Sequence, residues 1–569
     1  MAKIVGIDLG TSTSEISILK NGRPFLIPNT YDKNITPSVV YINEEGDVKV
    51  GDDAISYTIL EPENTIIEVK RLMGSQLPIK LGNKQMKPEE ISACILKYLK
   101  QCAEAYLGEA VDEAVITVPA YFTNDQRVAT TKAGELAGFK VERIINEPTA
   151  AALAYGIYHM KDQKYILVYD FGGGTLDVSV LEMFEGVLEV KASSGNNQLG
   201  GKEFDEAIIE MLVKDFEKQN KIDIKKDKKA MVRLKEASEK AKIELSENKS
   251  TTVNLPFLTL KEDEPLGIKR NITRRQFEKL IDKLVKSTLE PINEALNDAG
   301  LKVSEIDTVL LVGGTTKIPL VKETLKRKFL KEPLYEVNPD EAVACGAAIQ
   351  AAIKSGELSG EEDIIITDVC PYSLGIECVQ EIGGIELPGL LDILIERNTT
   401  VPVSVKKNYY TFSDNQTEAS IDVYQGDNMI AEENNNIGNI VISGIPKAIK
   451  GEEKIIVEFS YDINGILDVK AIIEKTKKEA SIRIDTKEVP IEKEIDVEVE
   501  WINSRYAKKV RVLIKKAEKL INSKGTLESL KEELRTTLYE LKYALATDNE
   551  AFVRRYEDEL TGLLYGVGE

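Results

Sequence analysis

Two stretches of the chain place an aspartate at the end of an apolar run and follow it with small residues. Residues 8–18 read DLGTSTSEISI and residues 170–180 read DFGGGTLDVSV. Glycines and small hydroxyl residues let a turn approach an anion, and the leading aspartate can hold hydrated Mg²⁺. One glycine-rich turn between strands is usually only a turn. The repeated pattern, however, indicates two duplicated halves that face a nucleotide from opposite sides.

Two glycine pairs add to this pattern. Residues 195–203 read GNNQLGGKE, but lysine does not directly follow Gly200, and Glu203 stands where a P-loop has Ser or Thr, so Gly200 and Gly201 are interpreted as a phosphate or ribose contact. Gly313 and Gly314 follow the apolar run 308–312. Without side chains they could support a flat nucleoside ring, although simple packing of a helix on a strand explains them equally well.

Glu147 lies just before the small-residue run PTAAALAYG of residues 148–156. Its ordinary interpretation is an acid at a helix N-terminus, where the helix dipole favours negative charge. In a phosphate site, the same carboxylate could orient an attacking water. The segment alone leaves both interpretations open.

Charge and composition exclude several classes of function. The 569 residues carry 74 basic and 95 acidic side chains, a net charge of -21, which argues against a protein that mainly holds a nucleic-acid backbone. His159 is the only histidine, so two-histidine zinc sites and chemistry that needs several acid/base histidines are not available. The remaining chemistry belongs to carboxylates, lysines, hydroxyls and backbone amides.

Periodicity divides the chain into parts that must position these groups. Residues 1–362 alternate strand-like runs with helical patterns, as in an α/β domain; strands are expected at 3–9, 114–118, 165–169 and 308–312. Residues 369–490 contain short β-branched runs separated by Gly, Asn and Pro turns, which predicts an all-β domain. Residues 491–569 are helical, with a leucine stripe from Leu527 to Leu545.

Residues 363–368 read DIIITD and stand between the first two parts. They could form an ordinary buried strand, but their position at a change of composition favours a linker that docks and undocks. Trp501, the only tryptophan, is interpreted as a core or interface residue.

The five cysteines contain no C-x-x-C pair and are odd in number, so we expect reduced, mostly buried thiols. The N-terminus has the pattern of a buried strand rather than of a signal peptide, and no apolar run reaches the roughly 20 residues of a membrane span. These features predict a soluble, cytoplasmic protein.

Several long motifs in one order resemble a known family. GIDLGTSTS, INEPTAAALAYG, YDFGGGTLDVSV, LVGGTTKIPLV and NPDEAVACGAAIQAAI, followed by DVCPYSLGIE, closely resemble the seventy-kilodalton heat-shock chaperones of the DnaK type. The resemblance extends from Lys3 to about Ile484 and thins in the helical tail. It implies a multidomain protein with an actin-like α/β ATPase domain, an all-β peptide-binding sandwich and a short α-helical lid.

By this resemblance the first domain binds ATP or ADP with Mg²⁺, and a monovalent cation, K⁺, near Asp177. Lys70 would stabilise charge on the γ-phosphoryl group and Glu147 would orient the attacking water. Asp8, Thr175 and Asp177 complete the implied catalytic set, and Asp8 and Asp170 would hold Mg²⁺ through water. The other implied phosphate or ribose contacts are Gly10, Thr11, Ser12, Gly172, Gly173, Gly174, Gly200 and Gly201.

The implied adenosine contacts come from both halves of the domain. They are Glu239, Lys242, Ser246, Gly313, Gly314, Lys317 and Asp340. Lys317 departs from the arginine usual in the family. Because a planar guanidinium stacks on adenine better than an ammonium does, we expect somewhat weaker nucleotide binding.

The sandwich would hold an extended apolar peptide by backbone hydrogen bonds and a side-chain pocket. The implied pocket and arch residues are Ile376, Val379, Phe412, Ala419 and Ile421. Phe412 is bulkier and Ala419 smaller than most members carry, and residues 380–392 are longer than the family loop. The implied interdomain coupling residues are Pro119, Arg127, Arg143, Ile364, Ile365, Ile366 and Asp368, with Arg143 and Asp368 matching positions used by a J-domain co-chaperone.

The resemblance implies an ATP-dependent chaperone that binds unfolded or extended apolar peptides. It also implies a J-domain co-chaperone and a nucleotide exchange factor as partners, a role in protein folding and the stress response, and no binding of nucleic acid or membrane. The short lid, the long loop and the altered pocket residues support an alternative, a nucleotide-dependent scaffold dedicated to one partner. A sugar kinase on the same ATPase fold is disfavoured by the all-β second part.

Overall fold

A computed structural model of the chain describes residues 3–159, 162–261, 264–335, 337–358, 365–382 and 385–483, then residues 501, 506–521 and scattered positions between 530 and 564. The chain separates into two compact units, residues 1–486 and 487–569. The predicted boundaries at 363 and at 490–491, and the predicted coupling residue Ile364, lie outside the described residues.

The first sheet forms around a strand that ends in Asp8. Its strand order is β11-β10-β1-β2-β3, with β4 paired to β2. Strand β1 pairs in parallel with β10 and antiparallel with β2. Valine and isoleucine on these strands are buried, which explains why such β-branched runs form the centre of the sheet. The bounds are β1 Ile4–Leu9, β2 Thr13–Lys20, β3 Arg23–Leu26, β4 Thr36–Pro37, β10 Glu113–Val118 and β11 Lys140–Asn146.

The second sheet repeats this arrangement. Strand β12 pairs in parallel with β17 and antiparallel with β13, as β1 does with β10 and β2. Asp8 pairs with Glu15 in one hairpin, and Asp170 with Asp177 in the other. The prediction of two duplicated halves is therefore confirmed, as are the four predicted strands. The bounds are β12 Lys164–Phe171, β13 Leu176–Phe184, β14 Val187–Asn196 and β17 Thr308–Val312.

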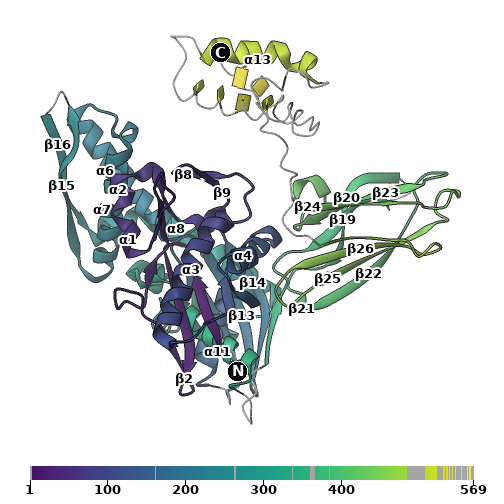
Figure 1. Cartoon of the computed structure of the whole chain (residues 1–569), viewed down its shortest axis with the longest axis horizontal. Helices are drawn as coiled ribbons and strands as arrows, with labels where there is room; N and C mark the ends of the chain where they lie inside the picture. Colours follow the sequence, from purple (N-terminus) through teal and green to yellow (C-terminus); the bar gives the residue numbers. More distant parts are fainter. Residues whose placement is uncertain are drawn as a thin grey trace. The chain divides into compact units, whose positions relative to one another are not determined.

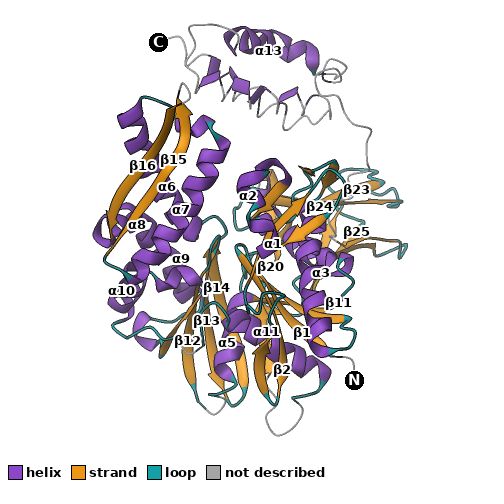
Figure 2. Cartoon of the chain, turned by 60° about the vertical axis from the view of Figure 1, so that its left-hand side comes forward, coloured by secondary structure: helices purple, strands orange, loops and turns teal. Residues whose placement is uncertain are grey.

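Helices α5 (Glu147–Gly156) and α11 (Ala342–Ser355) lie between the two sheets, as Figure 2 shows. Both are rich in alanine and buried along almost their whole length. Small side chains let helix and strand approach closely: a Cβ on Gly6 of β1 would lie 2.3 Å from the backbone of Ala347. The two helices thus join the halves into one α/β domain with the turns after β1 and β12 facing each other.

Smaller elements extend each half. In the first half these are β5 Val39–Ile42, β6 Val48–Val50, β7 Thr65–Ile67, β8 Ile79–Leu81, β9 Lys84–Met86, α1 Asp52–Ile55, α2 Tyr57–Leu60, α3 Pro88–Leu107, α4 Asn124–Leu136 and the 3₁₀ turn η2 Val69–Leu72. In the second half they are α6 Gly201–Asn220, α7 Lys228–Glu247, β15 Ser250–Lys261, β16 Glu264–Thr273, α8 Arg274–Ser287, α9 Leu289–Asp298 and α10 Pro319–Phe329. The long β15–β16 hairpin lies beside α6 and α7 (Figure 1).

Caps determine where several of these helices begin. Thr123 accepts a hydrogen bond from the backbone N–H of Gln126, whose side chain in turn accepts one from the backbone of Thr123. This capping box starts α4. Asp227 accepts from the N–H of Ala230 and starts α7 in the same way.

A β-sandwich of two four-stranded sheets follows, in the orders β20-β19-β23-β24 and β22-β25-β26-β27. Its core consists of alternating inward residues such as Val457, Phe459, Val469 and Ala471, as expected for strands with one buried face. The all-β prediction is therefore confirmed. The bounds are β19 Leu374–Ile382, β20 Ile385–Ile395, β22 Val403–Tyr410, β23 Glu418–Gln425, β24 Asn435–Ser443, β25 Lys454–Tyr461, β26 Leu467–Ile473 and β27 Glu479–Arg483.

The segment between the two parts forms a strand, β18 (Ile365–Val369), which pairs in parallel with β14. The sandwich strand β21 (Thr400–Val401) then pairs with β18. One sheet therefore runs from the α/β domain into the sandwich. Ile365 is 56% exposed while Asp368 and Val369 are buried, and β18 lies between β14 and β21 in the sheet, so the segment is a partly exposed strand rather than the fully buried strand that its isoleucines allowed.

In the second unit the described residues form a separate apolar cluster. Helix α13 spans Ala507–Ile521, and its Val510, Ile514 and Ala517 are buried together with Leu534 and Leu541 of the predicted leucine stripe. Trp501 is 8% exposed and belongs to the same cluster. This agrees with the interpretation of Trp501 as a core residue.

Candidate functional site

A small cavity of about 100 Å³ lies where the turn after β1 faces the turn after β12. Both duplicated hairpins contribute to it, together with the Gly313–Gly314 turn. The residues that line it include Asp8, Gly10, Thr11, Ser12, Lys70, Glu147, Asp170, Gly172, Gly173, Thr175, Gly313, Gly314 and Asp340. Most of the predicted phosphate-binding and catalytic residues are thus brought together.

Glycine is required at two of these turns for steric reasons. Gly313 has a φ of 80°, and a Cβ there would lie 2.5 Å from the carbonyl oxygen of Phe171. A Cβ on Gly200 would lie 2.5 Å from the backbone of Gly173. The turns therefore pack backbone against backbone, closer than any residue with a side chain would allow.

Lys70 and Glu147 form an ion pair at the bottom of this site. Lys70 belongs to the turn η2 of the first half, and Glu147 is the first residue of α5. They are only 5% and 8% exposed. On the other side of Lys70, Asp8 accepts a hydrogen bond of 2.8 Å from the hydroxyl of Thr117. An ammonium and a carboxylate are therefore held next to the phosphate-binding turns.

Burial raises the pKa values of the four carboxyl groups around Lys70. Desolvation raises the pKa of Glu147 to about 7, although Lys70 opposes the shift. It raises the pKa of Asp177 to about 6, and those of Asp8 and Asp170 also rise. For Lys70, burial would lower the pKa, but Glu147 and Asp8 outweigh it and the pKa rises. The site thus holds more negative charge than one lysine can balance.

This imbalance fits a hydrated cation. Oδ2 of Asp170 and Oδ2 of Asp177 are buried and have no hydrogen-bond partner in the protein. Among the described residues no three His, Cys, Asp or Glu side chains are arranged to hold a metal ion directly. Carboxylates that point into a cavity without closing around an ion suit Mg²⁺, which keeps several waters.

The predicted adenosine residues fall into two places. Ser246, Gly314 and Lys317 line one cavity of about 790 Å³, and Lys317 forms an ion pair with Asp340 beside it. Lys242 forms an ion pair of 2.7 Å with Asp205 and donates to the carbonyl of Gly201. Glu239 instead lines a different cavity of about 460 Å³, together with Ser12. The predicted set is therefore only partly gathered at one surface.

Sequence reasoning missed the charged contacts that cross between the two halves. Arg71, next to Lys70, donates from both Nη atoms to Oε1 of Glu203 at 3.1 Å. Glu68 contacts Lys202 and Lys235. Arg71 follows a predicted catalytic lysine, but nothing in the local sequence indicated partners more than 100 residues away.

In the sandwich, all five predicted peptide-pocket residues line one groove of about 590 Å³. Ile376 and Ile421 are buried at its base, whereas Val379 and Phe412 are exposed at its rim, Phe412 by 62%. Ala419 lies on the same strand as Ile421, at two-residue spacing, so both side chains share a face. The arrangement can accommodate an extended apolar segment.

Sequence reasoning also missed Tyr409 in this groove. Its ring lines the cavity, and its hydroxyl donates a 2.8 Å hydrogen bond to Asp392, which also accepts from Lys407. Tyr409 stands on β22 and Asp392 on β20, so this bond joins the two sheets of the sandwich. Residues 406–410 read KKNYY. This pattern does not indicate that Tyr409, rather than Tyr410, faces the interior of the sandwich.

Several predicted coupling residues lie where the α/β domain and the sandwich meet. Asp368 accepts a 3.0 Å hydrogen bond from the hydroxyl of Thr149, two residues after Glu147. Arg127 is 3% exposed and donates to Asn146, the residue before Glu147, at 2.7 Å. Both contacts therefore reach the segment that carries Glu147.

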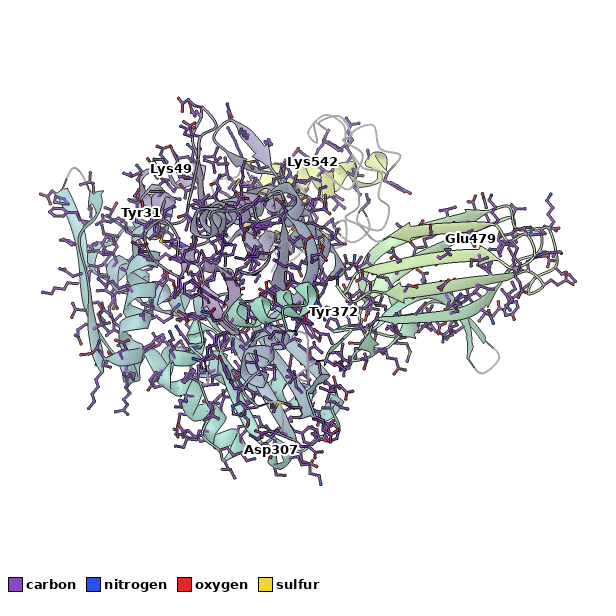
Figure 3. All side chains as sticks on the ribbon, turned by 60° about the horizontal axis from the view of Figure 1, so that its bottom comes forward. Tyr31, Lys49, Asp307, Tyr372, Glu479 and Lys542 are labelled. Atoms are coloured by element: carbon purple, nitrogen blue, oxygen red, sulfur yellow. The ribbon has the colours of Figure 1, made fainter. Side chains whose placement is uncertain are left out.

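Tyr121 links the nucleotide side to the sandwich directly. Its backbone N–H donates to Asp177 at 3.1 Å, and its carbonyl accepts from the hydroxyl of Tyr372 at 2.7 Å. The two tyrosine rings are 4.5 Å apart between centroids. Figure 3 places Tyr372 at the point where the sandwich strands leave the ATPase part.

Other contacts complete this interface. Asn464 of the sandwich accepts from the backbone N–H of Ile144, and Asn124 accepts from that of Leu467. Arg143, whose pKa is lowered by burial, donates to Gln350 at 2.7 Å. Pro119 is buried and its carbonyl accepts from Phe122. Ile366 is half-buried on β18.

Two facing halves with duplicated phosphate-binding hairpins, joined to a sandwich with an apolar groove, define a class of nucleotide-binding proteins with a second binding domain. The chain belongs to the Hsp70 family, because the family model described as Hsp70 protein matches residues 4–565. Members of this family are chaperones that hydrolyse ATP and bind ATP or ADP with Mg²⁺. Among the described residues, no helix is both long and apolar enough to span a membrane.

Proposed function

We propose that this chain is an ATP-driven chaperone in which the state of the nucleotide site controls the peptide groove. One observation carries this proposal: Tyr121 contacts Asp177 with its N–H and Tyr372 with its carbonyl. A shift of the backbone at Tyr121 would therefore act both on Asp177 of the nucleotide site and on Tyr372 of the sandwich. The contacts of Asp368 and Arg127 near Glu147 support the same conclusion.

In the hydrolysis step, Glu147 orients the water that attacks the γ-phosphorus. It acts from a buried position, where its carboxylate is fixed by the ion pair with Lys70. Lys70 lies beside the phosphate-binding turns. It stabilises charge as the bond between the γ-phosphorus and the ADP oxygen lengthens. Thr175 and the backbone of Gly172 and Gly173 bind phosphate oxygens from the cavity wall. Catalysis thus depends on positioning and electrostatics.

Mg²⁺ would be held through water by Asp8 and Asp170, and when bound it neutralises charge on the phosphates. Asp177, with an unpartnered buried oxygen, would help position K⁺. Gly10, Thr11 and Ser12 would bind phosphate from the first half. Lys317 and Ser246 would contact the adenosine from the cavity they share.

The peptide groove would bind an extended apolar segment over Ile376 and Ile421, with Val379 and Phe412 at the rim. In the arrangement described here β18 is paired with β14, and the sandwich contacts the ATPase part through Asn464 and Tyr372. We assign this docked arrangement to the ATP-bound state, in which peptide exchanges quickly. After hydrolysis, release of these contacts would allow the groove to retain peptide.

We also propose two protein partners, in line with the assignment of an ATP-driven chaperone. A J-domain co-chaperone would act near Arg143 and Asp368, and a nucleotide exchange factor would open the cleft. The cytoplasmic location and the DnaK type remain predictions. So does the short lid, because much of the tail lies outside the described residues.

The test is the affinity of the full chain for fluorescent apolar heptapeptides, measured by anisotropy with ADP and with ATP. We expect weaker binding with ATP. Equal affinity with both nucleotides would show that the sites are not coupled. Binding to one native protein and to no heptapeptide would favour the dedicated scaffold instead.

A further inference from the structure

Glu68 is a strained residue at the edge of the nucleotide cleft. It lies immediately before η2 and two residues before Lys70, and it has a left-handed backbone with a φ of 59°. Non-glycine residues adopt this conformation rarely and at some cost in free energy. Its carboxylate is 15% exposed. The fold therefore holds one acid in an unfavourable backbone conformation at a fixed place.

The carboxylate of Glu68 contacts two lysines from the opposite half. Oε2 lies 2.7 Å from Nζ of Lys202 on α6, and Oε1 lies 2.5 Å from Nζ of Lys235 on α7. Burial would raise the pKa of Glu68, but the two lysines outweigh it and the pKa is lowered. Glu68 thus stays ionised, and each of its oxygens is engaged by a separate element of the second half.

Further contacts also join the first half to α6 and α7 of the second half. Arg71, on the same turn, contacts Glu203 on α6, and the hydroxyl of Thr58 donates to Glu236 on α7 at 3.0 Å. Glu68 and Lys235 also line the cavity of about 460 Å³ that contains Ser12 of the phosphate-binding turn. The ionic contacts therefore bridge the cleft through which a nucleotide must pass.

We propose that Glu68 is a positioning residue that, through Lys202 and Lys235, holds the two halves closed over bound nucleotide and thereby sets its rate of release. This inference rests on the proposed function, since it assumes that the cleft binds ATP and ADP. Opening the cleft must separate Glu68 from both lysines. Each charge-assisted contact that is lost should speed release by about tenfold when partly shielded from water.

The experiment measures release of a fluorescent ADP analogue from the full chain by stopped-flow, with excess unlabelled ADP and no exchange factor. We expect Glu68→Gln to speed release by at least about tenfold. Release from the wild type should also accelerate with salt, and that dependence should weaken in the variant, because ionic contacts are screened. Glu63→Gln is the matched control: Glu63 is an exposed carboxylate on the preceding turn, and its removal should change nothing.

A second variant distinguishes the ionic contact from a general loss of structure. In the triple exchange Glu68→Lys, Lys202→Glu, Lys235→Glu, the attraction is restored with reversed charges, and we expect release to slow toward the wild-type rate.

An unchanged release rate in Glu68→Gln would overturn this inference alone, while nucleotide binding by the wild type would leave the proposed function intact. An equal acceleration in Glu63→Gln, or a triple exchange that releases as fast as Glu68→Gln, would also overturn it. A wild type that binds no nucleotide would overturn both.

Discussion

The hydroxyl of Tyr372 donates to the carbonyl of Tyr121, whose own N–H donates to Asp177. A residue of the sandwich is therefore separated from a carboxylate of the nucleotide site by the backbone of one residue, Tyr121, and two hydrogen bonds. Tyr372 is not among the residues that line the nucleotide cavity, and we assign it no catalytic role. Its position makes it a probe of coupling that leaves both binding sites in place.

Tyr372→Phe should reduce the coupling between nucleotide and peptide. The ring contact with Tyr121 remains, but the hydrogen bond, worth about 1 kcal/mol, is lost. We expect the ratio of peptide affinities with ADP and ATP to fall by about fivefold, measured by anisotropy. Tyr158→Phe removes the hydroxyl of an exposed tyrosine and should leave the ratio unchanged. A full wild-type ratio in Tyr372→Phe would contradict the relay through Tyr121.

Lys70→Ala should slow the chemical step. Removing a buried ammonium beside the phosphate-binding turns leaves the developing charge without its partner, and we expect a loss of about 10²-fold or more in single-turnover ATP hydrolysis. Lys80→Ala, at an exposed lysine of β8, is the control and should hydrolyse ATP normally. Unchanged turnover in Lys70→Ala would remove Lys70 from the catalytic set.

The nucleotide-free protein should lose stability as pH rises through the window set by Glu147. Burial raises the pKa of this carboxyl from 4.5 to about 7, so between these values the folded protein binds more protons than the unfolded chain. The free energy of unfolding then falls with rising pH. Glu147→Gln removes this contribution, and its stability relative to wild type should increase by up to about 3 kcal/mol across the window.

Urea denaturation of both proteins at several pH values between about 4.5 and about 7.5, followed by a probe of the ATPase part, measures this difference. Asp177, whose pKa rises to about 6, adds a loss of stability of its own in both proteins. A constant difference between variant and wild type at every pH would contradict the raised pKa of Glu147.

Ala419→Leu should narrow the peptide groove. Ala419 lines the cavity beside Phe412, and a larger side chain occupies volume that a peptide side chain would use. We expect about tenfold weaker binding of heptapeptides with a large central residue and a smaller effect on those with alanine there. Val441→Leu adds a methylene on the neighbouring strand at an exposed position outside the groove and serves as control. Equal losses for both peptide types would contradict the assignment.

The sequence predicted features that depend on local pattern and on repetition. The two Asp-led hairpins, the strand before Gly313 and the alternation in the sandwich each follow from residue types within about ten positions. The segment 363–368 was left between a buried strand and a linker that docks and undocks, because an isoleucine run can have the same composition in both. Only the register with Val187 and Leu188 on β14 decides this.

Long-range ionic contacts could not be predicted in this way. Glu68 lies in an unremarkable stretch, and nothing local indicates its left-handed backbone or its lysine partners 134 and 167 residues later in the chain. Tyr409 was missed because two adjacent tyrosines satisfy the strand pattern equally until the register is known. The prediction failed where the packing of distant elements, rather than periodicity, determines the role of a residue.

The parallel pairing of β18 with β14 has a consequence for the protein in the cell. If β18 detaches, β14 becomes the outermost strand of a twisted sheet and presents unpaired N–H and C=O groups to its surroundings. Open strand edges recruit other extended chains and start aggregation. A molecule that works among unfolded polypeptides would then expose such an edge in every cycle. Rapid pairing of β14 with β18 would therefore protect the protein from aggregation, in addition to its part in coupling the two domains.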